Sequence, residues 1–241
     1  MAEPEVDEQA RRAELAANLA DFRARVDTTC AGSGRDPAAV TLIAVTKTFP
    51  ASDVRLLAGL GVTDVGENRD QEAAPKHEQS AELGLRWHFV GRLQRNKCRS
   101  VVGYADLVHS VDRPELVDAL SAAAVTAGRG VSALIQVSLD ADHGAGRGGA
   151  APDAVVPLAE QLMAAAGLTL AGVMAVAPLG ADPDEAFARL ARVSETVRAI
   201  DNAASVVSAG MSSDFEAAIR HGATHLRVGT ALLGRRSTPV G

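Results

Sequence analysis

The chain has 241 residues, of which 47% are hydrophobic and only 3% aromatic, so it can bury a sizeable core built from Ala, Val, Leu and Ile. Its net charge of -6 argues against general binding to nucleic acid, because that affinity depends on Lys and Arg side chains that neutralise phosphates. The 2 cysteines and 6 histidines show no metal-ligand spacing and no disulfide framework, so metal catalysis is not expected.

The N-terminal segment is acidic and lacks the basic and then apolar order of a secretory signal. No apolar stretch approaches the roughly 20 residues that a membrane-spanning helix needs. We therefore expect a cytoplasmic protein without membrane association. A helix is predicted over residues 8–30, before the first strand.

Short β-rich apolar runs then alternate with Ala-rich segments of helical periodicity, which is typical of a parallel sheet covered on both faces. Eight such runs in a chain of this length predict an α/β fold: a single (β/α)8 TIM barrel over residues 1–241, with the N-terminal helix as an addition. A doubly wound open sheet is the alternative. The runs are residues 41–47, 63–68, 86–91, 107–112, 132–139, 170–178, 204–210 and 225–234.

The stretch DADHGAGRGGAAPD, residues 140–153, follows the fifth run and contains four glycines. The glycines disfavour a stable helix and predict a flexible loop. Loops that follow strands lie on the active face of such barrels, so a place near the site and a simple connector are both open interpretations.

The first run, TLIAVTK, ends on Lys47. By the two-residue period of a strand, Lys47 shares a face with Val45 and Ile43 and lies at the carboxyl end. A partly desolvated lysine there has a lowered pKa and serves as a nucleophile. The alternative is a lysine that simply reaches solvent.

Two later segments suggest an anion site. In SAGMSSDFEAAIRHGA, residues 208–223, Ser212, Ser213 and Asp214 are strong N-cap types, and Glu216 has the reciprocal capping spacing from Ser213. Free backbone N–H groups and a serine hydroxyl at such a junction bind phosphate, although plain capping explains the pattern equally well.

In HLRVGTALLG, residues 225–234, Gly229 and Thr230 are predicted to end the eighth strand, where barrels often hold phosphate. Arg227 has the same parity as Gly229, so it is expected to face the barrel mouth and to need a partner there. An amine close to a phosphate site suggests a phosphorylated aldehyde as the ligand.

Six segments, in this order and spacing, resemble the YggS/PLPBP family of pyridoxal 5′-phosphate (PLP) homeostasis proteins from about residue 10 to about residue 236. The resemblance implies a barrel similar to the N-terminal domain of alanine racemase, with PLP held as an internal aldimine on Lys47. The segments are LIAVTKTFP, GENRDQEAAPK, WHFVGRLQRNK, HSVDRPEL, GVMAVAP and SAGMSSDFEAAIRHGATHLRVGTALLG.

By the same resemblance, the PLP phosphate is held by Ser212, Gly229 and Thr230, with help from the backbone around Met211. Arg227 is expected to face the pyridine nitrogen, and Asn68 to lie near the ring. The chain departs from the family pattern outside these positions, at Arg69, Asp70, Ala209 and Arg147.

The implied function is PLP (vitamin B6) homeostasis with little or no catalysis, and the alternative is a PLP-dependent amino-acid racemase. Alanine racemases use a tyrosine supplied by a C-terminal β domain of the partner subunit. Tyr104 precedes the fourth run, which predicts a structural role at the stability face of the barrel. The candidates for a replacement base are His88 and His109.

The basic run GRLQRNKCRS, residues 91–100, is typical of a solvated helix face, and a rim that attracts anionic PLP or a partner protein is the alternative. No aromatic residue interleaves with its charges, so nucleic-acid binding is not expected. The implied partners are PLP itself and PLP-dependent apoenzymes as recipients. A monomer is favoured.

Overall fold

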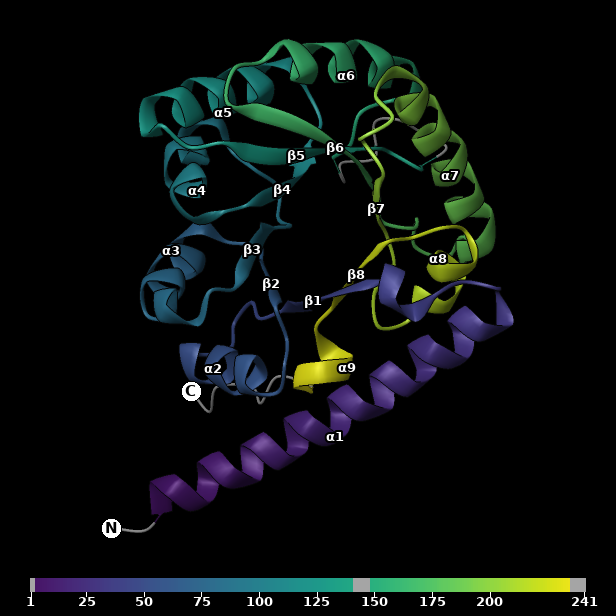
Figure 1. Ribbon diagram of the computed structural model, residues 1–241. Coiled ribbons are helices and arrows are strands. Elements are labelled where there is room, and N and C mark those ends of the chain that lie inside the picture. Colours follow the sequence, from purple (N-terminus) through teal and green to yellow (C-terminus); the bar gives the residue numbers. More distant parts are fainter. Residues whose placement is uncertain (1–2, 141–147, 235–241) are drawn as a thin grey trace.

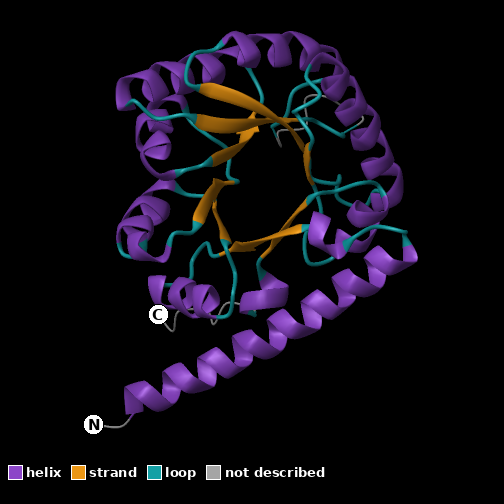
Figure 2. Ribbon diagram, viewed as in Figure 1, coloured by secondary structure: helices purple, strands orange, loops and turns teal. Residues whose placement is uncertain are grey.

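The computed structural model describes residues 3–140 and 148–234, and within these residues eight parallel strands close into a barrel in the order β1 to β8. Figure 1 looks along the barrel axis from the end at which the strands begin, and Figure 2 shows the ring of strands inside its ring of helices. The predicted (β/α)8 barrel is confirmed, and the open sheet is excluded because β1 pairs with β8. The strands are β1 (Thr41–Val45), β2 (Asp64–Glu67), β3 (Arg86–Phe89), β4 (Leu107–Val111), β5 (Val131–Gln136), β6 (Leu168–Met174), β7 (Val206–Ser208) and β8 (His225–Val228).

The helices pack around the outside of the barrel, and most follow the strand whose outer face they cover (Figure 2). They are α1 (Glu3–Gly32), α2 (Ala51–Gly59), α3 (Asp70–Glu78), α4 (Cys98–Tyr104), α5 (Pro114–Ala127), α6 (Val155–Ala164), α7 (Pro183–Ile200), α8 (Phe215–Arg220) and α9 (Thr230–Leu233). Short 3-10 turns lie at Pro37–Ala39, Ala81–Leu83, Arg95–Lys97 and Pro152–Ala154.

Helix α1 is the predicted N-terminal helix, and it lies along the outside of α2, α9 and α8 (Figure 1). Its apolar face packs Phe22 against Phe215 of α8, with ring centroids 4.6 Å apart. Its polar side chains bind the same neighbours: Asn18 Nδ2 donates to the Leu232 carbonyl of α9 at 3.0 Å, and Arg11 pairs with Asp53 of α2 at 2.7 Å. Helix α1 therefore braces the helices that follow the last two strands.

The main core lies between the strands and the helices and is largely aliphatic, as the low aromatic content requires. Apolar residues at helical spacing on α5, such as Leu116, Leu120 and Ala124, are buried against the outward side chains of the strands. The inside of the barrel differs, because it also contains buried polar side chains from β2, β3, β4, β7 and β8.

Several predicted runs are longer than the strands that form. The first strand ends at Val45, so Thr46 and Lys47 belong to the turn that follows. The eighth strand ends at Val228, and Thr230 begins α9 instead of ending the strand. Threonine and lysine occur in strands and in turns, so residue type alone does not locate the end of a strand.

Candidate functional site

A cavity of about 400 Å³ opens at the carboxyl ends of the strands, between β1 and β8. It brings together all seven residues that the resemblance singled out: Lys47, Asn68, Met211, Ser212, Arg227, Gly229 and Thr230. The remaining lining residues are Val45, Val90, Gly91, Val176 and Ser213.

The charge of this lining is one-sided. Lys47 and Arg227 are cations, and within the described residues no carboxylate lines the cavity. Hydroxyl groups of Ser212 and Thr230 lie among valine and methionine walls. A cavity of this size with few polar groups and a net positive lining suits a small anionic ligand with a flat apolar body.

Lys47 projects from the turn after β1, where its side chain is exposed. The expected partial desolvation is therefore absent, although the side chain does line the cavity. The residue before it, Thr46, is completely buried. The turn thus begins with a buried threonine, Thr46, and continues with the exposed amine of Lys47.

The predicted capping box at α8 is wrong. Asp214 occupies the N-cap position but makes no side-chain bond to the helix; its Oδ1 accepts from the Met211 backbone N–H at 2.6 Å. Glu216 pairs with Arg25 of α1, at 2.5 Å, because α1 crosses the start of α8. Asp214 thus orders the turn that contains Met211 and Ser212.

Ser212 connects the loops that follow β7 and β8. Its Oγ accepts a hydrogen bond from the Ala231 backbone N–H at 3.1 Å. A hydroxyl that accepts one bond keeps its own proton for another acceptor. This geometry brings a hydroxyl donor and the first residues of α9, beginning at Thr230, to one edge of the cavity.

Arg227 is 6% exposed, and its partners are both neutral. Its Nη1 donates to Ser208 Oγ at 2.6 Å, and its Nη2 donates to the Ala175 carbonyl at 2.9 Å. Burial lowers the pKa of Arg227 to about 10, so the guanidinium remains charged at neutral pH. The partner that Arg227 was expected to need is thus supplied by a hydroxyl and a carbonyl group. Neither is an anion, so no negative charge is in direct contact with the guanidinium.

Beneath Arg227, a line of buried polar side chains crosses the inside of the barrel. Ser208 Oγ lies 2.9 Å from His109 Nδ1, and His109 Nε2 lies 2.9 Å from His88 Nδ1. His88 Nε2 is 2.9 Å from Asp64 Oδ1. The line runs from the carboxyl end of β7 to the beginning of β2.

Donor and acceptor are fixed at the two ends of this line, at Asp64 and at Arg227. The pKa of Asp64 is raised by burial but lowered more by its bonds from His88 and Thr63 and by nearby positive charge, to about 2, so Asp64 only accepts and His88 Nε2 donates. Burial holds the pKa of His109 well below its usual value, so His109 is neutral. Ser208 Oγ accepts a hydrogen bond from Arg227 Nη1, and the same oxygen contacts His109 Nδ1, so it joins the arginine to the histidine pair.

The two histidines considered as replacement bases are therefore bonded within the barrel, and neither lines the cavity. Tyr104 lies at the end of α4, is 3% exposed and packs on Trp87, with ring centroids 6.4 Å apart. It too lies outside the cavity lining.

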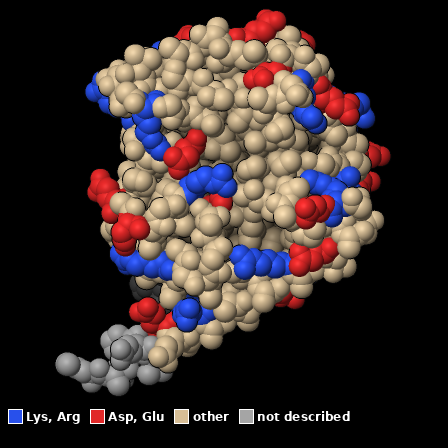
Figure 3. Space-filling view, viewed as in Figure 1, with Lys and Arg blue, Asp and Glu red and all other residues tan. Residues whose placement is uncertain are grey.

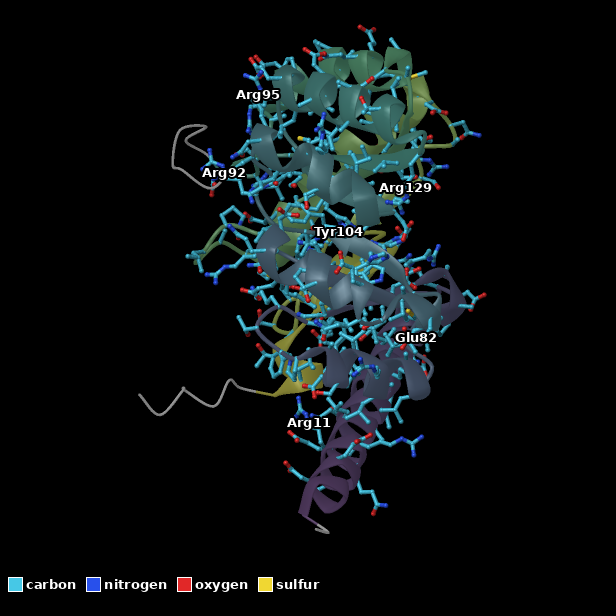
Figure 4. All side chains as sticks on the ribbon, turned by 90° about the vertical axis from the view of Figure 1, so that its left-hand side faces the viewer. Arg11, Glu82, Arg92, Arg95, Tyr104 and Arg129 are labelled. Carbon is cyan, nitrogen blue, oxygen red and sulfur yellow. The ribbon has the colours of Figure 1, made fainter. Side chains whose placement is uncertain are left out.

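Arg92 and Arg95 of the basic run are exposed at one end of the barrel in the side view of Figure 4, whereas Arg129 and Glu82, which precede strands, lie toward the other end. Lys97 pairs with Asp70 at 3.4 Å. The basic run thus flanks the end where the cavity opens. Residues 141–147 of the predicted glycine-rich loop lie outside the described residues.

Sequence reasoning missed several residues that shape this region. Ser208 and Asp64, which begin and end the polar line, gave no signal beyond a polar residue in an apolar run. Gly91 had a readable signal as a glycine that follows a strand: a Cβ there would lie 2.1 Å from the Asn68 carbonyl oxygen. Only glycine allows the loops after β2 and β3 to approach this closely.

A second cavity of about 370 Å³ lies at the opposite end of the barrel, where the strands begin. Figure 3 views this end, which is hollowed near its centre with charges of both signs around it. Its lining includes Arg23 and Arg86 together with Asp27 and Asp64. The positive and negative charges of this lining offset one another, whereas the cavity at the carboxyl ends of the strands has no carboxylate among its described lining residues.

The fold and the first cavity define a class: a (β/α)8-barrel protein with a small-anion site at the carboxyl ends of its first and last strands. The chain belongs to the alanine racemase N-terminal domain family, whose model matches residues 12–237, and within it to the pyridoxal phosphate homeostasis proteins.

Two curated relatives illustrate this membership. The pyridoxal phosphate homeostasis protein of Mycobacterium tuberculosis is 44% identical over 245 residues, with 94% of each chain covered. That of Pseudomonas aeruginosa is 39% identical over 222 residues, covering 92% of this chain and 96% of its own length.

Solved structures agree. PipY of Synechococcus elongatus, determined with PLP bound, superposes with a TM-score of 0.79 at 34% identity and covers 92% of this chain and 100% of its own. Alanine racemase of Corynebacterium glutamicum has a TM-score of 0.68 at 16% identity, covering 95% of this chain and 62% of the racemase, and shares the fold. No helix among the described residues is long and apolar enough to cross a membrane.

Proposed function

We propose that this protein binds PLP in the cavity between β1 and β8, with Lys47 as the attachment site, and acts in intracellular PLP (vitamin B6) homeostasis with little or no catalysis. The observation that carries the proposal is the cavity itself, which combines a primary amine, a buried arginine and hydroxyl donors and, among the residues that the structure describes, has no carboxylate in its lining. PLP supplies an aldehyde that condenses reversibly with a primary amine, and it also carries a phosphate and a pyridine ring.

Each residue has a role in this proposal. Lys47 would hold PLP through its amine, which can condense with the aldehyde with loss of one water molecule. The phosphate is bound by Ser212, Gly229 and Thr230, with the backbone at Met211. The available proton of Ser212 supports this assignment, and so does the lack of a competing carboxylate in the described part of the lining. Asn68 contacts the ring, whose flat faces are covered by the apolar walls.

Arg227 is assigned to the pyridine nitrogen. A guanidinium has no acceptor and stays protonated, so it donates to the nitrogen and keeps that nitrogen unprotonated. An unprotonated ring is a weaker electron sink. Burial lowers the pKa of Arg227 to about 10, which still leaves the guanidinium charged at neutral pH, and this supports a chemically subdued cofactor.

A racemase would also need an acid or base at the opposite face of the substrate. His88, His109 and Tyr104 are all buried away from the cavity lining, which favours binding over catalysis. General acid or base catalysis contributes roughly 10² to 10⁴ in rate, so its loss would leave at most slow proton exchange. Incubation of the PLP-loaded protein with L- and D-alanine in deuterated water tests this: fast exchange of the α-proton would establish the racemase instead.

Attachment at Lys47 is tested by borohydride reduction followed by peptide mapping. The wild-type protein with PLP should show a visible absorbance band and a reduced adduct on Lys47, whereas Lys47→Ala should show neither. Lys97→Arg is the matched control, because Lys97 pairs with Asp70 and does not line the cavity. An adduct on Lys76, or a band that survives in Lys47→Ala, would refute the assignment of Lys47.

The proposal extends to PLP-dependent apoenzymes as recipients of PLP, to a cytoplasmic location and to a monomeric state. Light scattering of the loaded protein tests the last point, since a mass of twice 24.8 kDa would establish a dimer. Transfer is tested by mixing the loaded protein with an apoenzyme and a scavenger of free PLP; recovery of enzyme activity no faster than from the scavenged free pool would argue against delivery.

A further inference from the structure

The turn that carries Lys47 is bonded to the end of β2 and to α3 by three side chains of the GENRDQEAAPK segment. Thr46 and Thr48 are the two neighbours of Lys47, and each is held by a different part of this segment. Lys47 itself is exposed, so packing does not hold its side chain. The position of its backbone therefore decides where the amine can reach.

Thr46 is bonded to Lys76 and Glu67. Its carbonyl accepts a hydrogen bond from Lys76 Nζ at 2.9 Å, and its Oγ1 donates to Glu67 Oε1 at 2.7 Å. Lys76 also forms an ion pair with the same Glu67 oxygen, and both side chains are almost completely buried. Separation of this pair would leave a buried charge desolvated without compensation, so the contact resists rearrangement.

Thr48 is held from the side. Its backbone N–H donates to Glu72 Oε2 at 2.9 Å, and the other Glu72 oxygen accepts from Arg69 Nη1 at 3.3 Å. Thr48 has a φ of 68° and is the only described non-glycine residue with a positive φ. A β-branched residue adopts this conformation only where its surroundings enforce it.

From these contacts we infer that the end of β2 and α3 position the attachment lysine: Glu67, Lys76 and Glu72 hold the Thr46–Thr48 turn in a strained conformation that aims Lys47 into the cavity. This inference rests on the proposed function, since it concerns the lysine assigned to PLP. It names three positioning residues that do not themselves line the cavity. Their contribution is to the rate and geometry of attachment.

Replacement of Glu72 is the central test. Glu72→Ala should slow attachment of PLP to Lys47 by about 10- to 100-fold, the size expected for loss of one charge-assisted hydrogen bond, and should shift the absorbance band. Glu72→Gln retains an oxygen that can accept from the Thr48 N–H, so it should stay within a few-fold of wild type. Attachment is followed by stopped-flow absorbance and by borohydride trapping.

Lys76→Met and Lys76→Arg test the other contact. Lys76→Met should slow attachment as Glu72→Ala does, and Lys76→Arg should restore part of the rate. Lys76→Met leaves Glu67 buried without its cation, so this variant can fail to fold. Glu72 is only half-buried, and its variants keep the inference testable in that event.

Arg55→Ala is the matched control. Arg55 Nη2 donates to the carbonyl of Gln79, the residue that ends α3. This bond lies at the end of α3 away from the Thr46–Thr48 turn. It should weaken the helix and leave the attachment rate unchanged. Equal slowing in Arg55→Ala and Glu72→Ala would show that general loosening of α3, and not these contacts, is responsible.

A measurement without PLP separates this inference from the proposed function. In the unloaded protein, exchange of the Thr48 amide hydrogen, followed by NMR, should be faster in Glu72→Ala than in wild type and Arg55→Ala. If amide exchange is faster in Glu72→Ala but PLP attaches to the wild-type protein at a residue other than Lys47, the assignment of Lys47 fails while the anchoring of the turn by Glu72 stands. If Glu72→Ala changes neither the exchange nor the attachment rate, the inference is overturned.

Discussion

At the scale of single residues, the site depends on hydrogen bonds that hold its side chains and loops in place. Ser212 binds a neighbouring loop, Asp214 binds back to Met211, and Arg227 binds a hydroxyl and a carbonyl. Each of these contacts fixes a side chain or a backbone segment that faces the cavity. The result is a preorganised anion site, in which few groups must be ordered when a ligand binds.

Replacement of Ser212 should therefore weaken ligand binding more than it weakens the fold. Ser212→Ala removes one hydroxyl donor to the phosphate and should reduce PLP affinity by about 1 to 3 kcal/mol, roughly 5- to 150-fold in Kd. Equilibrium titration of the absorbance band measures this. Ser213→Ala is the control, because Ser213 lines the same cavity but was not assigned to the phosphate; an equal loss in both variants would remove Ser212 from its proposed role.

At the scale of elements, the loops after β7 and β8 are supported from outside by α1. Phe22 and Arg25 contact α8, and Asn18 contacts α9. These two helices have only 6 and 4 residues, too short to be stable alone. Their geometry, and with it the edge of the cavity, depends on packing against a helix of 30 residues.

The turn between β7 and α8 also requires a glycine. Gly210 has a φ of 89°, and a Cβ there would lie 2.7 Å from Ala218 Cβ of α8. Gly210→Ala should destabilise the protein by about 1 to 3 kcal/mol, since it adds both a left-handed backbone penalty and a steric overlap. Urea unfolding measures the change.

Gly103→Ala provides the comparison for that experiment. Gly103 lies within α4, and a Cβ there would meet nothing within 4 Å. This variant should be neutral or stabilising by up to about 1 kcal/mol, because alanine is a better helix former. A destabilisation of Gly103→Ala as large as that of Gly210→Ala would mean that the turn geometry is not the cause.

At the scale of the whole molecule, the polar line from Arg227 to Asp64 joins the two ends of the barrel. In an apolar barrel interior, Arg227 would lose its Ser208 partner and keep only the Ala175 carbonyl. The line ends on a carboxylate whose folded pKa is about 2, below its usual 3.8. A lowered carboxylate pKa stabilises the folded state above the unfolded pKa, and this stabilisation disappears as pH falls.

Acid should therefore remove a specific part of the stability. From the shift of Asp64, about 2 kcal/mol is present above pH 4 and is lost between about pH 4 and pH 2. The difference in unfolding free energy between wild type and Asp64→Asn should narrow over this range. A difference that is constant from pH 7 to pH 2.5, measured by urea unfolding, would show that Asp64 does not titrate as expected.

The repeating pattern of apolar runs and helical segments was sufficient to predict the barrel, because a parallel sheet buried on both faces needs continuous apolar strands. The seven residues predicted from a recognisable motif do lie around one cavity. The limits of the strands were less accessible, since Thr46 and Lys47 are as compatible with a strand as with a turn. The capping prediction at Ser213 and Glu216 failed because the partner of Glu216 is 191 positions away, on α1.

The sequence by itself determined the barrel and the set of side chains available for an anion and an aldehyde, because these follow from local periodicity and residue type. Residue type does not show that Lys47 is exposed on a strained turn held by β2 and α3, that Arg227 has neutral partners, or that His88 and His109 are bonded to each other. These properties depend on contacts between residues distant in the chain, which residue type alone does not specify. Burial and hydrogen-bond partners set the charge and direction of each group.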